Sequence, residues 1–368
     1  MKHRNILFII LHSSFFTLHS LLLVGCEKQI DIDIENLESQ VVVQSQGEAG
    51  VPLAVSLTYS RPTFGSFYVY NGEDYFQSIT DATVTLSVNG GTPETATRDH
   101  GTQAPRLQNC GTYTFSHIPQ PGEELELAIS VPGKDEVKAS ATVPLLAQVG
   151  DITVSTVTEL PDIDGNADVN ISVFVPLTDR ASSDDYYSII MTRYDTTIYT
   201  YYDEADAVSF YDTVIYERDW FECQDQLLVN DMDPVDAIEG MSIPTFYGSE
   251  MLFTDAYING TTHSIELRTY ADIYYYNNEG RWRDDGNGYY MEYPYRFTYV
   301  IHSTFKIEVK TLTRDLYLYR QTMDNYSDDE LLGYFSEPVP IHSNIDGGIG
   351  IFGLSSKKTY SVTLDIQQ

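Results

Sequence analysis

The chain of 368 residues has few cations and few cysteines, and each shortage excludes a class of protein. Its 21 lysines and arginines stand against 54 acidic residues, which gives a formal net charge of −33. Such an acidic surface repels phosphate backbones, so the composition excludes nucleic acid as a partner. Three cysteines are too few for a disulfide scaffold, and the scattered histidines lack zinc-binding spacings such as H-E-x-x-H.

Motifs for catalysis and for metals are also missing. The segment "DIDGNAD" at 162–168 has its glycine at the wrong position for an EF-hand, and Val173 stands where that loop requires glutamate. An irregular calcium site there is the alternative to a solvated loop. The segment "YGSE" at 247–250 lacks the second glycine of a nucleophile elbow. We therefore expect no enzyme activity, no metal and no cofactor, and rank an envelope hydrolase last.

The glycines of "NIDGGIGIFG" at 344–353 spell G-x-G-x-x-G, the pattern of a dinucleotide-binding loop. That loop needs a following helix and an acidic residue about 20 positions later. Only fifteen residues follow Gly353, and they alternate as a strand does. The pattern therefore predicts a glycine-rich turn before a terminal strand.

The first 25 residues have the features of a lipoprotein signal peptide. Basic Lys2 and Arg4 precede an apolar run from Ile6 to Val24, and "LVGC" ends at Cys26. A small residue followed by cysteine is the cleavage pattern of lipoproteins, so we expect acyl chains on Cys26 and an acidic tether over 26–37. The alternative is an uncleaved membrane anchor.

The body of the chain reads as mainly β. Short alternating segments with turn residues between them, such as "ATVTLSVNGG" and "ELELAISVPG", predict an N-terminal Ig-like antiparallel β-sandwich over 38–147. A larger β-rich domain over 148–368 should follow. It carries one packed helix near 313–326, with Thr313 as its N-cap.

Two further groups of residues are candidates for function or stability. The segment 272–297 is dense in tyrosine, glycine and asparagine, the residues that recognition loops use. We predict a glycan- or peptide-binding surface there, and the alternative is ordinary strand tyrosines; the candidates are Tyr274, Tyr275, Tyr276, Trp282, Tyr289 and Tyr290. Cys110 and Cys223 are either a disulfide or two isolated thiols.

Several stretches in order resemble a family of Bacteroidota lipoproteins of unknown function that are commonly encoded beside TonB-dependent outer-membrane receptors. These stretches are "ITDATVTLSVNGG" at 79–91, "EMLFTDAYINGTTHSIEL" at 250–267, "TLTRDLYLYRQTM" at 311–323 and "FSEPVPIHSNIDGGIGIFG" at 335–353. The resemblance implies an outer-membrane lipoprotein with a TonB-dependent barrel as its partner, and it assigns no activity.

These observations lead to one functional hypothesis with one alternative. We expect a non-catalytic lipoprotein, anchored to the outer membrane and facing the cell surface, that serves as accessory or ligand-capture partner of the transporter. The acidic residues after Cys26 favour the surface, and the periplasmic face is the alternative. The alternative function is a freestanding adhesin that binds glycans or host proteins.

Overall fold

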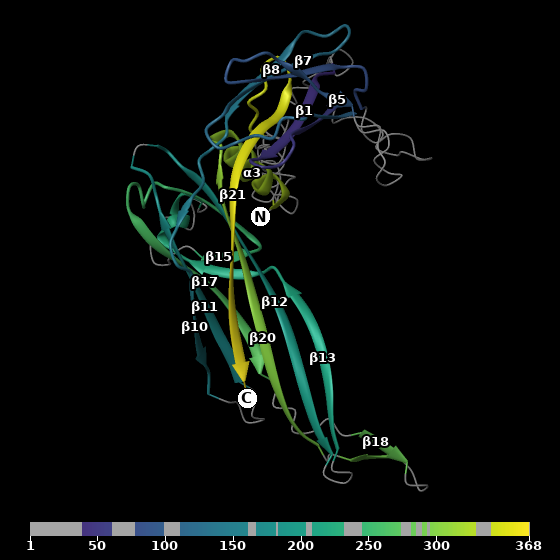
Figure 1. Cartoon of the computed structure of the whole chain (residues 1–368), viewed down its shortest axis with the longest axis vertical. Coiled ribbons are helices and arrows are strands. Elements are labelled where there is room, and N and C mark those ends of the chain that lie inside the picture. The colour runs from purple at the N-terminus through teal and green to yellow at the C-terminus, as the bar shows by residue number, and fades with distance from the viewer. Residues whose placement is uncertain are drawn as a thin grey trace, which may run out of the picture. The chain divides into compact units, whose positions relative to one another are not determined.

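The computed structural model describes residues 39–60, 78–98, 111–160, 167–181, 183–203, 208–231, 245–273, 281–284, 289–292, 295–328 and 340–367. These residues form four β-sheets, one α helix and one 3-10 helix (Figure 1). Most of the described residues lie in strands, and these strands bury every second side chain, as the alternating sequence segments predict.

The largest sheet has nine strands in the order β13-β12-β20-β21-β1-β2-β6-β5, with β16 also paired to β12. Its strands are β1 (Val41–Glu48), β2 (Ala54–Tyr59), β5 (Thr97–Arg98), β6 (Gly111–Thr114), β12 (Tyr186–Asp203), β13 (Val208–Arg218), β16 (Glu250–Thr254), β20 (Tyr295–Leu312) and β21 (Ile349–Gln367).

The N-terminal sandwich forms where β1, β2, β5, β6 and the start of β21 in this sheet pack on a second sheet. That second sheet has the order β4-β3-β7-β8, with β3 (Thr83–Val88), β4 (Glu94–Thr95), β7 (Glu124–Ser130) and β8 (Val137–Thr142). Alternate residues such as Val43, Leu57 and Leu127 fill the shared core. The predicted turn after β3 is confirmed, because Asn89 and Gly90 both have positive φ, as a type I′ turn requires.

A second core lies between two layers. One layer consists of β12, β16, β20 and β21 of the large sheet. The other is a six-stranded sheet of order β10-β11-β17-β14-β15, in which β9 also pairs with β11. This sheet contains β9 (Gln148–Val149), β10 (Thr153–Thr158), β11 (Ala167–Thr178), β14 (Phe221–Gln224), β15 (Thr245–Gly248) and β17 (Thr262–Ile273). Figure 1 shows β10, β11 and β17 as a layer beside β12 and β20. The 3-10 helix η2 (Gln226–Asp231) follows β14.

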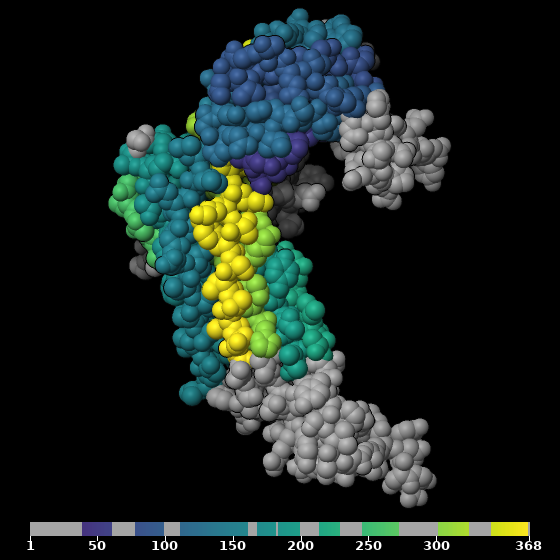
Figure 2. Space-filling view, in the orientation of Figure 1, coloured from purple at the N-terminus to yellow at the C-terminus, as the bar shows by residue number. Residues whose placement is uncertain are grey.

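The C-terminal strand β21 takes part in both cores. Phe352 and Leu354, near its start, lie in the N-terminal core, whereas Ile366, near its end, lies in the second. It pairs parallel with β1 and antiparallel with β20. In Figure 2 its yellow surface runs from beside the purple β1 to beside the green β20. The sandwich is therefore not purely antiparallel.

Two of the glycines in the G-x-G-x-x-G pattern allow β21 to approach its neighbours closely, one towards β1 and the other towards the helix that precedes it in sequence. Gly350 has φ +115, and a Cβ there would fall on the Val43 carbonyl oxygen of β1. A Cβ on Gly353 would lie 2.7 Å from the Leu316 side chain of the helix. The predicted turn before the terminal strand is found at Gly347 and Gly348, whereas Gly350 and Gly353 lie within β21 and serve close packing.

The predicted helix is confirmed as α3 (Arg314–Asp328), which packs Leu316, Tyr317 and Tyr319 on Leu312 and Ile351. Thr313 precedes the helix, but its hydroxyl accepts from the Leu354 N–H of β21 instead of from the helix's own first turn. Thr313 does occupy the predicted N-cap position, because its carbonyl accepts the Tyr317 N–H at 3.1 Å, and its hydroxyl ties the helix to β21.

The predicted fold class, a β-sandwich followed by a β-rich part with one packed helix, is confirmed for the residues that the structure describes. The ranges predicted as two domains, 38–147 and 148–368, contribute strands to one nine-stranded sheet. The position near residue 148 therefore does not separate one sheet from another. Among the described helices, none is long and apolar enough to cross a membrane.

Candidate functional site

The outer face of the six-stranded sheet carries a group of exposed aromatic rings. Along β14 the side chains alternate, so that Phe221 and Cys223 are fully buried while Glu222 faces outward. The same alternation places Trp220, just before β14, on the outer side. On β17, Leu267 and Ala271 face the core, and Tyr270 faces outward.

The strand register aligns these outward residues in two rows across the sheet. In one row Tyr247 pairs with Glu222, Glu222 with Arg268, and Arg268 with Ser172. In the other, Tyr270 pairs with Asn170, next to Trp220. The aromatic rings therefore come from β17 and from the β14–β15 side of the sheet. We call the polar side chains beside them, on β11, β17 and β14, the polar row: Asn170, Ser172, Arg268 and Glu222.

Three rings form what we call the aromatic platform: Trp220, Tyr247 and Tyr270. The centroids of Trp220 and Tyr247 are 6.0 Å apart with the rings 20° from parallel, and Tyr270 meets Trp220 edge-on at 6.3 Å. Their exposed fractions are 41%, 61% and 43%, in the same order. Such ring pairs stabilise one another while leaving their outer faces open to a ligand.

A shallow hollow of about 460 Å³ lies beside the platform, lined by Trp220, Tyr270 and the polar row. That volume falls within the range of small-molecule sites. In the row, Arg268 Nη2 donates to Glu266 at 3.1 Å, and Ser172 Oγ donates to the other Glu266 oxygen at 2.7 Å. The hydrogen bond from Arg268 is the main reason that the pKa of Glu266 is lowered, so this carboxylate is charged at neutral pH.

A buried polar cluster lies beneath the platform and fixes its backbone. Arg193, 2% exposed, reaches from β12 to the other sheet, where its Nη1 donates to the Tyr270 carbonyl at 2.9 Å. Its Nε donates to Asp195 at 2.6 Å, and Ser303 Oγ donates to the same oxygen at 2.7 Å. Because a buried charge is tolerated only when it is paired and hydrogen-bonded, this cluster holds the Tyr270 backbone in one place.

A second cluster contains three buried aspartates, Asp179, Asp185 and Asp255, whose oxygens lie within 4.8 Å of one another. Three carboxylates are ligands that a hard cation such as Ca²⁺ prefers. Here protein donors already occupy them: Arg180 donates to Asp185 at 2.6 Å, and Tyr187 donates to Asp179 at 2.7 Å.

The same cluster joins the two halves of the "FTDAYING" segment to the chain before β12. Asp255 accepts the Asp185 N–H at 3.0 Å, and Asp179 accepts the Gly260 N–H at 3.0 Å. Burial, followed by the charges of Asp179 and Asp185, raises the pKa of Asp255. We interpret the cluster as a structural junction of this segment.

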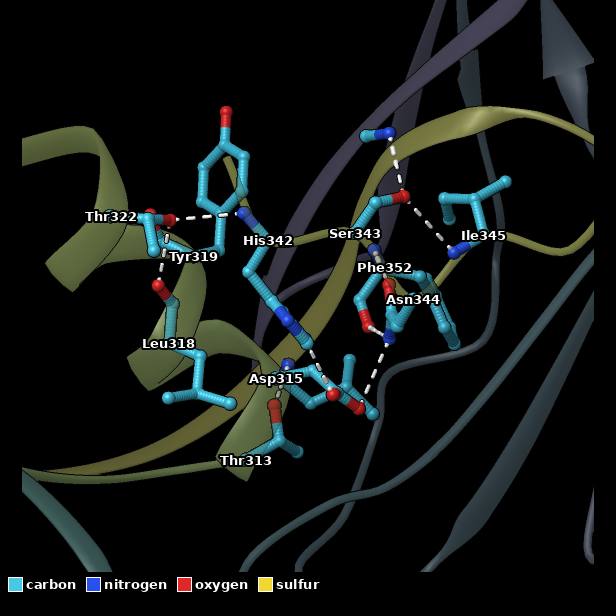
Figure 3. A network of polar contacts seen from close by, with 12 residues as sticks. Thr313, Asp315, Leu318, Tyr319, Thr322, His342, Ser343, Asn344, Ile345 and Phe352 are labelled. Atoms are coloured by element: carbon cyan, nitrogen blue, oxygen red, sulfur yellow. Dashed lines mark hydrogen bonds and ion pairs between the residues drawn. The ribbon is translucent and has the colours of Figure 1, made fainter. Parts of the chain in front are cut away.

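A third network joins α3 to the residues before β21 (Figure 3). His342 Nε2 lies 2.8 Å from Asp315, at the start of the helix, while the His342 N–H donates to Thr322 in its last turns. Asn344 bonds both the N–H and the C=O of Phe352 at 2.9 Å. Ser343 Oγ accepts the Gly350 N–H at 3.1 Å. Since these polar atoms hold backbone, the network is a clamp rather than a reactive site.

A hollow of about 670 Å³ next to Asp315 and Asn344 is larger than the one at the platform. Its described lining consists of polar residues and of Pro93, Leu127, Ala128 and Ala139, with no aromatic ring. We therefore rank it below the platform as a ligand site.

The sequence-predicted candidates fall largely outside the part of the chain that can be described. Cys26, Cys110 and Tyr274, Tyr275 and Tyr276 lie outside it. Trp282 lies on β18 (Arg281–Asp284), and Tyr289 and Tyr290 lie on β19 (Tyr289–Glu292) of a two-stranded sheet, but only their backbone is described. The predicted binding surface there therefore stays a prediction, and the two alternatives for Cys110 and Cys223, a disulfide or two isolated thiols, stay open.

Cys223 is fully buried on β14, and burial raises the pKa of its thiol to about 12. Sequence reasoning missed Trp220, Tyr247 and Tyr270. The sequence does contain a signal for Trp220. The chain has only two tryptophans, and Trp220 stands directly before an alternating segment that begins with the apolar Phe221. Such a position points outward from the sheet.

Comparisons with known proteins identify a family but not a function. A search of curated proteins finds no match. One solved structure, of carbohydrate-binding modules from the β-sandwich superfamily, is 7% identical and aligns over 72% of this chain and 96% of its own, with a TM-score of 0.17. A partial N-terminal region of an enterococcal surface protein is 10% identical over 73% and 89%, with a TM-score of 0.13. Scores this low carry no argument.

A sequence profile described as a domain of unknown function, DUF4249, matches residues 27–361. This match spans the N-terminal sandwich, the sheets around the second core, the helix α3 and most of β21. The chain therefore belongs to the DUF4249 family.

Proposed function

We propose that the mature protein is a lipid-anchored, non-catalytic binding protein of the outer membrane that captures a ligand at the cell surface for a TonB-dependent transporter. The observation that carries the capture role is the aromatic platform of Trp220, Tyr247 and Tyr270. Rings so exposed on one sheet face are typical of recognition surfaces, where tyrosine and tryptophan provide most of the contact energy.

The anchoring part of the proposal rests on the sequence. The basic start, the apolar run and the "LVGC" segment favour acyl chains on Cys26, and the acidic residues that follow favour the outer surface. The transporter partner rests on the family resemblance of the four stretches named above.

The surroundings of the histidines support a non-catalytic role. Each described histidine that has a side-chain partner meets a carboxylate: His117 with Glu123, His263 with Asp225, His302 with Asp365 and His342 with Asp315. Among the described contacts, none of these histidines bonds a serine hydroxyl or a cysteine thiol, as an activated nucleophile would require.

Affinity purification tests the transporter partnership. The tagged protein is recovered from mildly solubilised outer membranes, with Cys26→Ser as the control that cannot be lipidated. We expect the wild type to bring a TonB-dependent barrel with it in stoichiometric amount, and the control to be missing from the membrane fraction. Recovery of the lipoprotein alone, with the barrel intact in the same extract, would contradict the partnership.

The alternative, a freestanding binder of glycans or host proteins, is favoured by one observation. The three rings of the platform lie together on one face of a single sheet and are 41%, 61% and 43% exposed, which suits direct binding of a glycan or a host protein as well. Equal ligand affinity with and without a co-purified barrel would favour that alternative.

A further inference from the structure

We propose that the aromatic platform and its polar row bind a neutral oligosaccharide. This inference rests on the proposed function, because it names the ligand class of the same site. A sugar ring has an apolar C–H face and a rim of hydroxyl groups, and the outer sheet face offers a matching partner for each.

The apolar side of the match is the set of exposed rings. Trp220 and Tyr247 stack on each other with their ring planes 20° from parallel, and the two residues stay 41% and 61% exposed, so the uncovered ring faces and edges are the apolar surface that they offer to a ligand. The adjoining hollow of about 460 Å³ extends this surface past Tyr270. It has room for a short stretch of a chain of sugar rings rather than for a folded protein domain.

The polar side of the match consists mainly of acceptors. Asn170 uses its amide nitrogen to bond Glu159 at 2.8 Å, so the side-chain oxygen of this exposed residue is the atom that can accept from a ligand. The Glu222 carboxylate lies 3.9 Å from Arg268, beyond hydrogen-bond range, so its lone pairs are open to ligand donors. Arg268 has five donors and supplies the complementary role.

This balance distinguishes a saccharide from the other ligand that stacks on tyrosine and tryptophan, a proline-rich peptide. Proline has no N–H, so a polyproline segment offers only carbonyl acceptors to the row. Sugar hydroxyls both donate and accept, and can satisfy Asn170, Glu222 and Arg268 together.

Charge selects among saccharides. The polar row contains one carboxylate, Glu222, and one guanidinium, Arg268, whose charge is already paired with the neighbouring carboxylate of Glu266, within a chain of net charge −33. An anionic sugar would meet excess negative charge at the site and across the protein. The geometry therefore points to an uncharged ligand.

Calorimetric titration of the mature protein in detergent tests the inference. The panel contains cellohexaose, xylohexaose, mannohexaose and maltohexaose as neutral sugars, trigalacturonic acid as the anionic one, and a decaproline peptide. We expect at least one neutral sugar to bind, and Trp220→Ala to weaken that binding roughly tenfold or more, as loss of a central aromatic anchor does. Tyr257→Ala is the matched control, since Tyr257 is 46% exposed and lies outside the platform.

Four results would overturn the inference. These are no neutral sugar binding at millimolar concentration, binding that Trp220→Ala leaves unchanged, preference for the anionic sugar, and decaproline binding that depends on Trp220. Circular dichroism of Trp220→Ala checks that the variant folds, and Glu222→Ala, on the exposed polar row, should independently weaken sugar binding. Barrel recovery in the affinity purification is read separately, so failure of the saccharide and failure of the transporter partnership are distinguishable.

Discussion

The clamp between α3 and β21 makes a quantitative prediction at Asn344. Its side-chain amide bonds both the N–H and the C=O of Phe352 at 2.9 Å, and the Phe352 side chain is fully buried. Asn344→Ala leaves both backbone groups without that partner. An unsatisfied buried group costs about 1–3 kcal/mol, and some water can reach this half-buried position, so we expect a loss of about 2–4 kcal/mol.

Urea unfolding followed by circular dichroism measures this loss as a lower midpoint. Asn170→Ala removes an exposed asparagine and should change the free energy of unfolding by less than about 0.5 kcal/mol. Asn344→Asp keeps an acceptor for the Phe352 N–H but loses the donor and brings a carboxylate near Asp315. It should therefore also be destabilised at neutral pH. An unchanged midpoint for Asn344→Ala would refute the argument that this amide anchors the start of β21.

Three further predictions concern buried groups. Arg193→Met should lower the free energy of unfolding by about 3 kcal/mol in urea titrations, because the buried Asp195 loses its closest cation and keeps, among the described contacts, only Ser303 and the more distant Arg218 at 3.9 Å. A loss below about 1 kcal/mol would contradict the cluster. Asp255 has a raised folded-state pKa, so its stabilising contribution is present below its ordinary value of 3.8 and is lost as pH rises through the folded value. Asp255→Asn should then gain stability over the wild type as pH rises from 4 to 7, and thermal stabilisation of the wild type alone by Ca²⁺ would contradict the structural reading. Burial raises the pKa of the Cys223 thiol to about 12, so Cys223 should react with iodoacetamide at pH 8 only after the protein is unfolded. Fast labelling of the folded protein would contradict the burial of this thiol. No labelling even after unfolding would show that Cys223 is bridged to Cys110.

Local patterns were sufficient to predict the individual elements. The alternation of apolar residues located β2, β3, β7 and β8, and helical spacing located α3 within two residues at each end. The glycine pattern was correctly taken as structural because too few residues followed it for a βαβ unit. These features depend on neighbouring residues, which is why a single sequence reveals them.

Features that depend on long-range pairing could not be predicted. The parallel pairing of β1 with β21 joins residues about 300 positions apart, and no local period encodes it. The platform has the same origin, since Trp220, Tyr247 and Tyr270 come from three segments whose alignment is set by strand register. The tyrosine-rich segment 272–297 is a separate prediction made from composition, and its side chains lie outside the described residues.

The emission of Trp220 tests most directly whether the platform is the ligand site. The chain has two tryptophans, so Trp282→Phe leaves Trp220 as the only one, and its fluorescence can be followed while each neutral hexasaccharide is added. A sugar stacked on the ring removes it from water, so we predict a saturable shift of its emission to shorter wavelength, with the midpoint found by calorimetry. Calorimetric binding without any change in Trp220 emission would place the ligand elsewhere and contradict the account.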